Sequence, residues 1–207
     1  MNPLHRGHIY LVDDNPEIRF HLSDLLQKRG YSVQAYDAAS SFLKHGVAMF
    51  PAVLILDVRM PGMSGIELQQ TLRAMGRQTP IVFISGECQS HEIIQAMKGL
   101  PIEFLLKPFS MDQLIEAVDR GMSCDRSLQN EANRVSELRR KWQTLTARER
   151  DVFLLMLEGH TNMGMSELLD ILPDTIKKHR SNVLQKMHTP HLADLMALCK
   201  GLDVSSF

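Results

Sequence analysis

The stretch that decides the fold is Ala52-Val-Leu-Ile-Leu-Asp57-Val-Arg-Met-Pro-Gly-Met-Ser-Gly65. Five apolar residues lead directly into Asp57, and a loop rich in turn-forming residues follows. A continuous apolar run of this kind is typical of a strand that is buried on both faces of a parallel sheet. The carboxyl end of such a strand lies where open α/β sheets bind their ligands. Asp57 is therefore the first candidate for a functional residue.

Polar residues also end or follow three other apolar runs. Asp13 and Asp14 come after residues 9–12, Ser85 ends residues 81–85, and Lys107 comes after residues 104–106. Close carboxylates repel, so Asp13, Asp14 and Asp57 need a cation to lie together, and oxygen ligands suit Mg²⁺. Asp57 could then attack phosphorus, while Lys107 and Ser85 hold phosphoryl oxygens. Each aspartate alone is more often a cap or a turn residue, and Lys107-Pro108 alone indicates nothing. It is their joint order that predicts a metal and phosphate crevice.

Strand and helix patterns alternate through the first half. We expect strands at residues 9–12, 31–36, 52–57, 81–85 and 103–106, and helices from about 16, 40, 66, 91 and 111. Asn15-Pro16 has the residues of a helix N-cap and first helical position, and Ser110 with Gln113 forms a capping box. Five strand–helix units predict an α/β fold in which helices cover both faces of a parallel sheet.

Composition limits the class of protein. The chain has 207 residues, 44% of them hydrophobic, and a formal net charge of −1, which fits one large or two small globular domains. The three cysteines, Cys88, Cys124 and Cys199, are too widely spaced for a metal pair or a disulfide framework. No apolar run approaches the ~18 residues that a membrane span needs. We expect a cytoplasmic protein with no membrane partner.

The second half reads as short helices. Thr146 and Glu149 form a capping box, Thr161 or Asn162 caps the next helix, and Pro173 begins a helix that reaches residue 187. That helix is apolar on one side and carries lysines on the other. A last helix is expected from Thr189-Pro190 to residue 198. The pattern predicts a helix-turn-helix, but a small helical bundle with a solvated charged face explains it equally well.

Residues 123–143 join the halves. Leu128, Val135, Leu138, Trp142 and Leu145 recur at a partial heptad spacing. One long helix whose apolar stripe packs on its own domains is the favoured interpretation. A dimeric coiled-coil neck is the alternative.

Residues 1–122 resemble the receiver domain of two-component response regulators, which implies a flavodoxin-like order of the five strand–helix units. The resemblance rests on Val12-Asp13-Asp14, on residues 56–65, on Ser85-Gly86 and on residues 104–109. It implies that Asp57 accepts phosphate from a sensor histidine kinase. It also implies that Mg²⁺ binds directly to Asp14, Asp57 and the backbone carbonyl of Arg59, and to Asp13 mainly through water. It further implies that Lys107 contacts the phosphoryl group before a cis Lys107-Pro108 bond, with Ser85 and Phe104 as the switch residues.

Residues 144–207 resemble the LuxR-type DNA-binding domain, with residues 123–143 as a helical linker. The resemblance rests on residues 145–150, Gly159, Asn162, residues 175–183 and Lys186-Met187. Both halves together are similar to the NarL/FixJ family of response regulators, closest to the FixJ side. That family controls transcription, dimerises on phosphorylation and binds promoter DNA. The residues expected to face base edges are Lys177, Lys178 and Ser181, and those expected to serve phosphate contacts or packing are Thr175, His179, Arg180, Asn182 and Lys186.

Some positions depart from the family pattern. Met163-Gly164 replaces Lys-Glu, and Leu172 stands where a capping residue is usual before the recognition helix. These changes predict a less stable scaffold helix and leave open a regulator that has lost specific DNA binding and acts through a protein partner. An enzyme alternative is a phosphatase of the haloacid dehalogenase type. Arg59 argues against it, because that class needs a second aspartate at this position.

Overall fold

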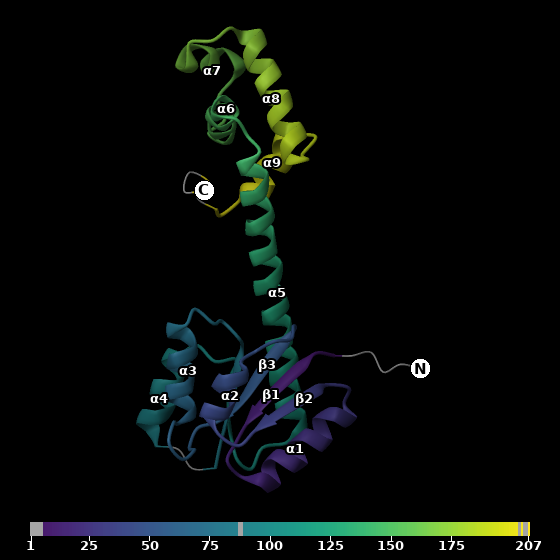
Figure 1. The fold of residues 1–207 in the computed structure, drawn as a ribbon, viewed down its shortest axis with the longest axis vertical. Coiled ribbons are helices and arrows are strands. Elements are labelled where there is room, and N and C mark those ends of the chain that lie inside the picture. The colour runs from purple at the N-terminus through teal and green to yellow at the C-terminus, as the bar shows by residue number, and fades with distance from the viewer. Residues whose placement is uncertain (1–5, 87–88, 203, 205–206) are drawn as a thin grey trace. The chain divides into compact units, whose positions relative to one another are not determined.

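The computed structural model describes residues 6–86, 89–202, 204 and 207. The chain divides into two compact units, Met1–Gln129 and Asn130–Phe207. Figure 1 shows the strands and helices of both units. None of the helices in the described ranges combines the length and the apolar character that crossing a bilayer requires. The two units are described separately below.

The first unit is built around five parallel strands in the order β2-β1-β3-β4-β5. The strands are β1 (His8–Val12), β2 (Ser32–Tyr36), β3 (Ala52–Asp57), β4 (Ile81–Ser85) and β5 (Glu103–Leu106). The helices are α1 (Pro16–Lys28), α2 (Ala39–His45), α3 (Gly65–Ala74), α4 (Ser90–Lys98) and α5 (Met111–Gln143). This is the flavodoxin-like order, so the predicted α/β fold class is confirmed.

Two apolar cores lie on opposite faces of this sheet. Alternate strand residues pack against α1 and α5 on one face, where Ile55 and Leu114 are fully buried. The intervening residues, among them Leu56, pack against α2, α3 and α4 on the other face. All six residues of β3 are buried, which explains why its sequence does not alternate between apolar and polar side chains. Burial on both faces fixes the carboxyl end of β3 at the middle of the sheet.

Local signals in the sequence are confirmed at the ends of several elements. The Asn15 side chain accepts from the backbone of Glu17, and Ser110 and Gln113 exchange the two hydrogen bonds of a capping box. The Lys107–Pro108 peptide bond is cis, as the resemblance implied. Helix α5 continues without a break to Gln143, so the predicted junction at residues 122 and 123 is not a helix end. The proposed bounds of the linker stay a prediction.

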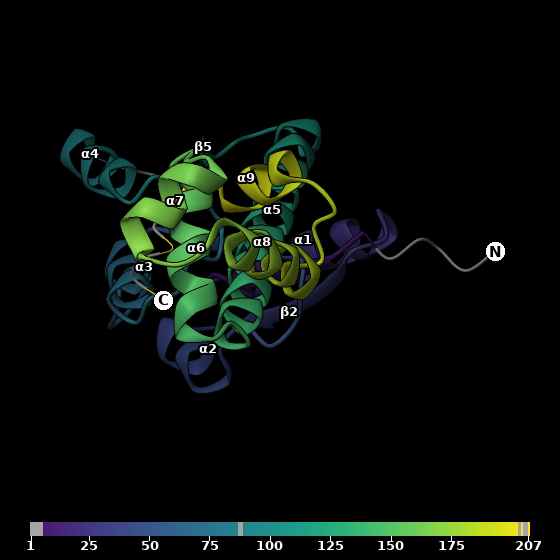
Figure 2. The same ribbon diagram turned by 90° about the horizontal axis from the view of Figure 1, so that it is seen from above.

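The second unit is all-helical. It contains the end of α5 and then α6 (Ala147–Leu157), α7 (Asn162–Leu169), α8 (Pro173–Met187) and α9 (Leu192–Cys199). Figure 2 shows these helices from above, after a 90° turn about the horizontal axis. Thr146 and Thr161 cap α6 and α7 as predicted. The predicted start of the last helix at Thr189-Pro190 is wrong, because α9 begins only after His191, whose backbone N–H donates to Asp194.

The end of α5 belongs to the core of the second unit. Leu138 is fully buried there, and the Trp142 ring meets the Phe153 ring edge-on at a centroid distance of 5.1 Å. Leu145 is also buried in this cluster. The apolar stripe of the predicted linker therefore packs within the chain at these three positions, as the long-helix interpretation expected. The dimeric neck stays an alternative prediction.

Candidate functional site

The predicted crevice lies at the carboxyl ends of β1, β3, β4 and β5. Asp13 follows β1, Asp57 ends β3, and both residues are buried, at 1% and 6% exposure. The Lys107 ammonium, which follows β5, lies 3.0 Å from Asp13 Oδ2 and 2.9 Å from Asp57 Oδ1. One lysine therefore joins the two carboxylates that the sequence had placed on separate strands.

Backbone groups hold the other oxygen of each carboxylate. Asn15 N–H donates to Asp13 Oδ1 at 2.8 Å, and Arg59 N–H donates to Asp57 Oδ2 at 2.8 Å. Both contacts span two residues, a turn geometry in which an aspartate side chain mimics a backbone carbonyl. The two carboxylates are thus fixed in orientation before any ligand arrives.

The electrostatics of the crevice follow from this geometry. Burial raises the pKa of Asp57, and the hydrogen bond and charge of Lys107 oppose that rise only in part, because Asp13 repels the same carboxylate. Burial lowers the pKa of Lys107, but its hydrogen bonds to Asp57 and Asp13 reverse that effect and leave a net increase. Lys107 therefore stays charged at neutral pH, and Asp57 is a carboxylate held in a partly desolvated place.

The predicted metal ligands are brought together only in part. Asp14 is exposed, and the described residues contain no group of three acidic, histidine or cysteine side chains arranged as a metal site. Lys107 supplies the positive charge between Asp13 and Asp57. The oxygen donors offered by Asp13, Asp14 and Asp57 still fit the chemistry of Mg²⁺, which needs few protein ligands and keeps several waters.

The predicted switch residues lie beside the crevice. Ser85 is buried at the end of β4 and pairs with Leu106 across the sheet. Phe104 is partly buried, and its ring centroid lies 5.9 Å from that of Phe83. The Arg59 side chain leaves the crevice and contacts Glu92 of α4, which sequence reasoning missed. No pattern in the sequence joins these two positions, because they are 33 residues apart.

The predicted DNA-reading helix is α8. Thr175, Lys177, Lys178 and Ser181 are exposed, whereas His179, Arg180, Asn182 and Lys186 are partly buried. Lys177 pairs with Asp174 of its own first turn. Exposed cations and hydroxyls on one helix can form hydrogen bonds with the base edges and the phosphates of a nucleic acid.

Two more of the predicted DNA contacts have partners on other helices of the second unit. Lys186 Nζ lies 2.5 Å from Glu149 Oε2, and Arg180 Nη1 donates to Asn162 Oδ1 at 2.6 Å. Lys186 also donates to the carbonyl of Thr144. These contacts tie α8 to α6 and α7, so packing is part of the role of both residues. The sequence predicted Glu149 as part of the capping box at Thr146, but it did not predict the contact between this buried acid and Lys186.

Comparison with known proteins covers almost the whole chain. A family model described as the response regulator receiver domain matches residues 9–119, and one described as bacterial regulatory proteins of the luxR family matches residues 143–199. The response regulator protein TodT of Pseudomonas putida is 36% identical, over 95% of this chain and 87% of its own. The transcriptional regulatory protein FixJ of Rhizobium meliloti is 33% identical, over 95% and 98%.

Solved structures agree with these relatives. The response regulator StyR, solved at low resolution, aligns with a TM-score of 0.82 at 37% identity and covers 93% of this chain and 98% of its own. Full-length FixJ from B. japonicum aligns with a TM-score of 0.56 at 32% identity, over 93% and 95%. Both similarities span the sheet-based unit and the helical unit. The chain belongs to the NarL/FixJ family of two-component response regulators, transcription regulators that join a receiver domain to a LuxR-type helix-turn-helix and are not enzymes.

Proposed function

We propose that Asp57 accepts a phosphoryl group from a sensor histidine kinase and that this event controls the binding of α8 to promoter DNA. The observation that carries the proposal is the Lys107 ammonium, which lies within 3.0 Å of both Asp13 and Asp57. A partly buried cation between two oriented carboxylates is suited to charge that arrives on a phosphoryl group. Membership of the receiver family supports the same assignment.

The transfer is a displacement at phosphorus. An Asp57 oxygen forms the new O–P bond as the P–N bond to the kinase histidine breaks, and the electron pair of that bond returns to the imidazole nitrogen. Lys107 holds one phosphoryl oxygen and the Ser85 hydroxyl another. Asp13, Asp14, Asp57 and the Arg59 carbonyl would hold Mg²⁺, which would neutralise negative charge there. Arg59 N–H keeps Asp57 oriented for the attack.

The readout of phosphorylation runs from the crevice to the second unit. The Ser85 hydroxyl turns toward the phosphoryl group, and Phe104, beside Phe83 in the core, follows it inward. The phosphorylated receiver forms a homodimer, and two copies of α8 bind DNA together. Lys177, Lys178 and Ser181 contact base edges. The residues that serve phosphate contacts or packing are Thr175, His179, Arg180, Asn182 and Lys186.

Phosphorylation can be tested with a small phosphodonor. Incubating the full-length protein with acetyl phosphate and MgCl₂ should add one phosphoryl group to its intact mass, and Asp57→Asn should abolish the gain. Asp112→Asn is a matched control, since Asp112 lies in the first turn of α5 and is not among the residues of the crevice. A mass gain that persists in Asp57→Asn would place the acceptor elsewhere.

A second candidate is a regulator whose second unit binds a protein rather than specific DNA. The observation that favours it is the exposure of three apolar side chains on and after α7, Met163 at 60%, Leu168 at 59% and Leu172 at 75%. Footprinting the phosphorylated protein on DNA upstream of its own gene separates the candidates. Protection of one sequence that weakens as salt rises supports DNA control, and its absence supports the protein partner.

A further inference from the structure

Helix α4 is held to the receiver mainly by its two ends. Of its nine residues, Ser90–Lys98, only Ala96 is buried. Ile94 and Met97 are large apolar residues with exposures of 61% and 48%. A helix with so little buried apolar surface gains little stability from packing, so polar contacts at its ends matter more than usual.

The first end of α4 is joined to the loop that follows Asp57. Arg59 Nη2 donates to Glu92 Oε2 at 2.9 Å, and Arg59 Nε donates to Glu92 Oε1 at 3.3 Å. Glu92 Oε2 also accepts from the backbone N–H of Gln89 at 2.7 Å, so the same carboxylate caps the helix. A two-point contact between a guanidinium and a carboxylate fixes orientation as well as distance.

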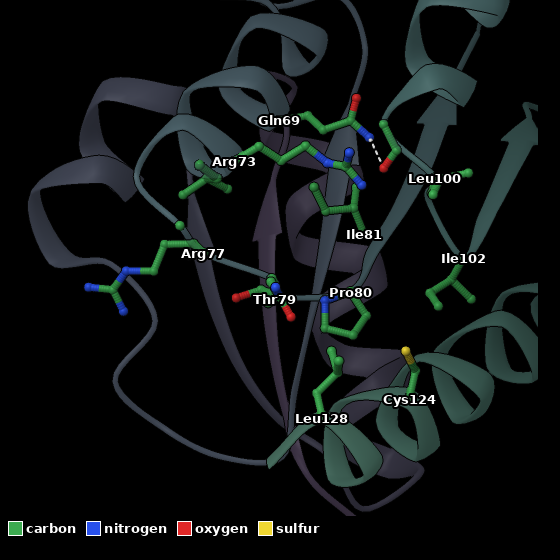
Figure 3. A pocket seen from close by; sticks show the side chains of 14 residues that line it. Gln69, Arg73, Arg77, Thr79, Pro80, Ile81, Leu100, Ile102, Cys124 and Leu128 are labelled. Carbon is green, nitrogen blue, oxygen red and sulfur yellow. Dashed lines mark hydrogen bonds between the residues drawn. The ribbon is translucent and has the colours of Figure 1, made fainter. Parts of the chain in front are cut away.

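The second end of α4 is fixed to α3. Gln69 is buried, and its Nε2 donates to the carbonyl of Gly99 at 3.2 Å, the dashed line in Figure 3. A Cβ at Gly99 would lie 2.1 Å from the Gln69 side chain, so the two segments are in close contact. The next residue, Leu100, has a φ of 40° and is 81% exposed beside a cavity of about 420 Å³. This end has close packing at Gly99 and open space next to it.

Arg59 is connected to both the acceptor and the helix. Its backbone N–H donates to Asp57 Oδ2, while its side chain reaches Glu92. A phosphoryl group on Asp57 carries more negative charge than the Glu92 carboxylate and offers three acceptor oxygens. The Arg59 side chain is 46% exposed and therefore partly solvated. Its guanidinium can exchange one anionic partner for another without first leaving a buried site.

Resting on the proposed phosphorylation of Asp57, we propose that Arg59 is a latch on α4. At rest it holds the first turn of α4 through Glu92. When Asp57 carries a phosphoryl group, the Arg59 guanidinium turns to that group and releases Glu92. The first turn of α4 then loosens, while the Gln69–Gly99 contact keeps the far end attached. The phosphoryl state is thereby coupled to the exposed apolar residues Ile94 and Met97.

Hydrogen exchange of the full-length protein, read by mass spectrometry, tests the latch. At rest, Glu92→Gln should speed exchange in residues 91–95 by about threefold to fivefold, the effect of losing one partly exposed ion pair. Acetyl phosphate should produce a similar increase in the unmodified protein and little further increase in Glu92→Gln. Exchange near Gly99 should change least, because the Gln69 contact is kept.

Glu67→Gln is the matched control. Glu67 caps α3 as Glu92 caps α4, accepting from the backbone N–H of Ser64 at 2.8 Å. It should leave exchange in α4 unchanged. The latch is overturned if Glu92→Gln exchanges like the unmodified protein at rest, or if α4 does not respond in protein whose intact mass carries the phosphoryl group. An intact mass without that group would instead overturn the proposed function, and with it the trigger of the latch.

Discussion

Lys186 Nζ lies 2.5 Å from Glu149 Oε2, and this ion pair joins α8 to the first turn of α6. Glu149 is 3% exposed, while one third of the Lys186 side chain remains accessible. Thr146 donates its backbone N–H to the same carboxylate oxygen at 2.8 Å. The helix that is proposed to read DNA is therefore positioned by the acid that also closes the capping box of α6.

Replacing Glu149 by glutamine should destabilise the second unit by about 2 kcal/mol at neutral pH, because Lys186 loses a buried anionic partner. Burial raises the pKa of Glu149, but hydrogen bonds from Lys186 and Thr146 outweigh it and lower that pKa to about 2. A depressed carboxyl pKa stabilises the fold above the unfolded value of 4.5, and that stability is lost as pH falls toward 2.

The measurement is urea unfolding followed by the fluorescence of Trp142, the single tryptophan of the chain and a member of this core. The difference between Glu149→Gln and the unmodified protein should shrink as pH falls from 4.5 to 2. Glu167→Gln, at an exposed position of α7, should have no such effect. A difference that is independent of pH would contradict the ion-pair explanation.

Replacing Leu172 by a residue that can cap α8 should stabilise the second unit. It occupies the N-cap of α8 with a φ of −58° and a ψ of 143°, and it offers no side-chain oxygen to the free N–H groups of the helix. Leu172→Ser should therefore stabilise the second unit by about 1 kcal/mol. Leu172→Ala removes the same exposed leucine without adding a cap, and it serves as the control. Equal midpoints of urea unfolding for the two variants would show that capping is not the missing contact.

The sequence predicted most of the fold because its signals are local. Asn15, Thr146 and Thr161 each cap a helix within three residues of themselves, and the buried run of β3 is continuous along the chain. The crevice was predictable for a related reason, since the ends of parallel strands must meet at one edge of the sheet.

Side-chain contacts across the fold were not predictable in this way. Glu92 and Glu149 both resemble ordinary capping acids in the sequence, yet each also meets a distant cation, Arg59 or Lys186. Nothing local distinguishes a capping acid that has such a partner from one that has none. The start of the last helix was predicted wrongly for a different, local reason. Thr189-Pro190 has the residue types of a helix start, whereas His191, the observed N-cap, is not a common capping residue.

Removing Lys107 should make Asp57 harder to ionise. Burial already raises the Asp57 pKa, and Lys107 is the main group that opposes it. Lys107→Met leaves Asp57 facing Asp13 without a cation between them, so its pKa should rise further. A pH titration of the Asp57 carboxyl by ¹³C NMR measures the shift. Lys28→Met, which removes a lysine paired with Asp24 on the surface, should leave Asp57 unchanged. An unchanged midpoint in Lys107→Met would contradict the assigned role.

Lys178 and Lys186 should differ in what their loss does to DNA binding. Lys178 is exposed on α8, so Lys178→Ala should alter the preference among sequences and leave the unfolding midpoint unchanged. Lys186→Ala should weaken binding to all sequences alike and also lower the unfolding midpoint, because Glu149 stays buried without its cation. Binding to a footprinted sequence and to a scrambled one, at several salt concentrations, separates these outcomes. If Lys178→Ala weakened binding to both sequences equally, Lys178 would be a phosphate contact. Base contacts would then lie elsewhere on α8.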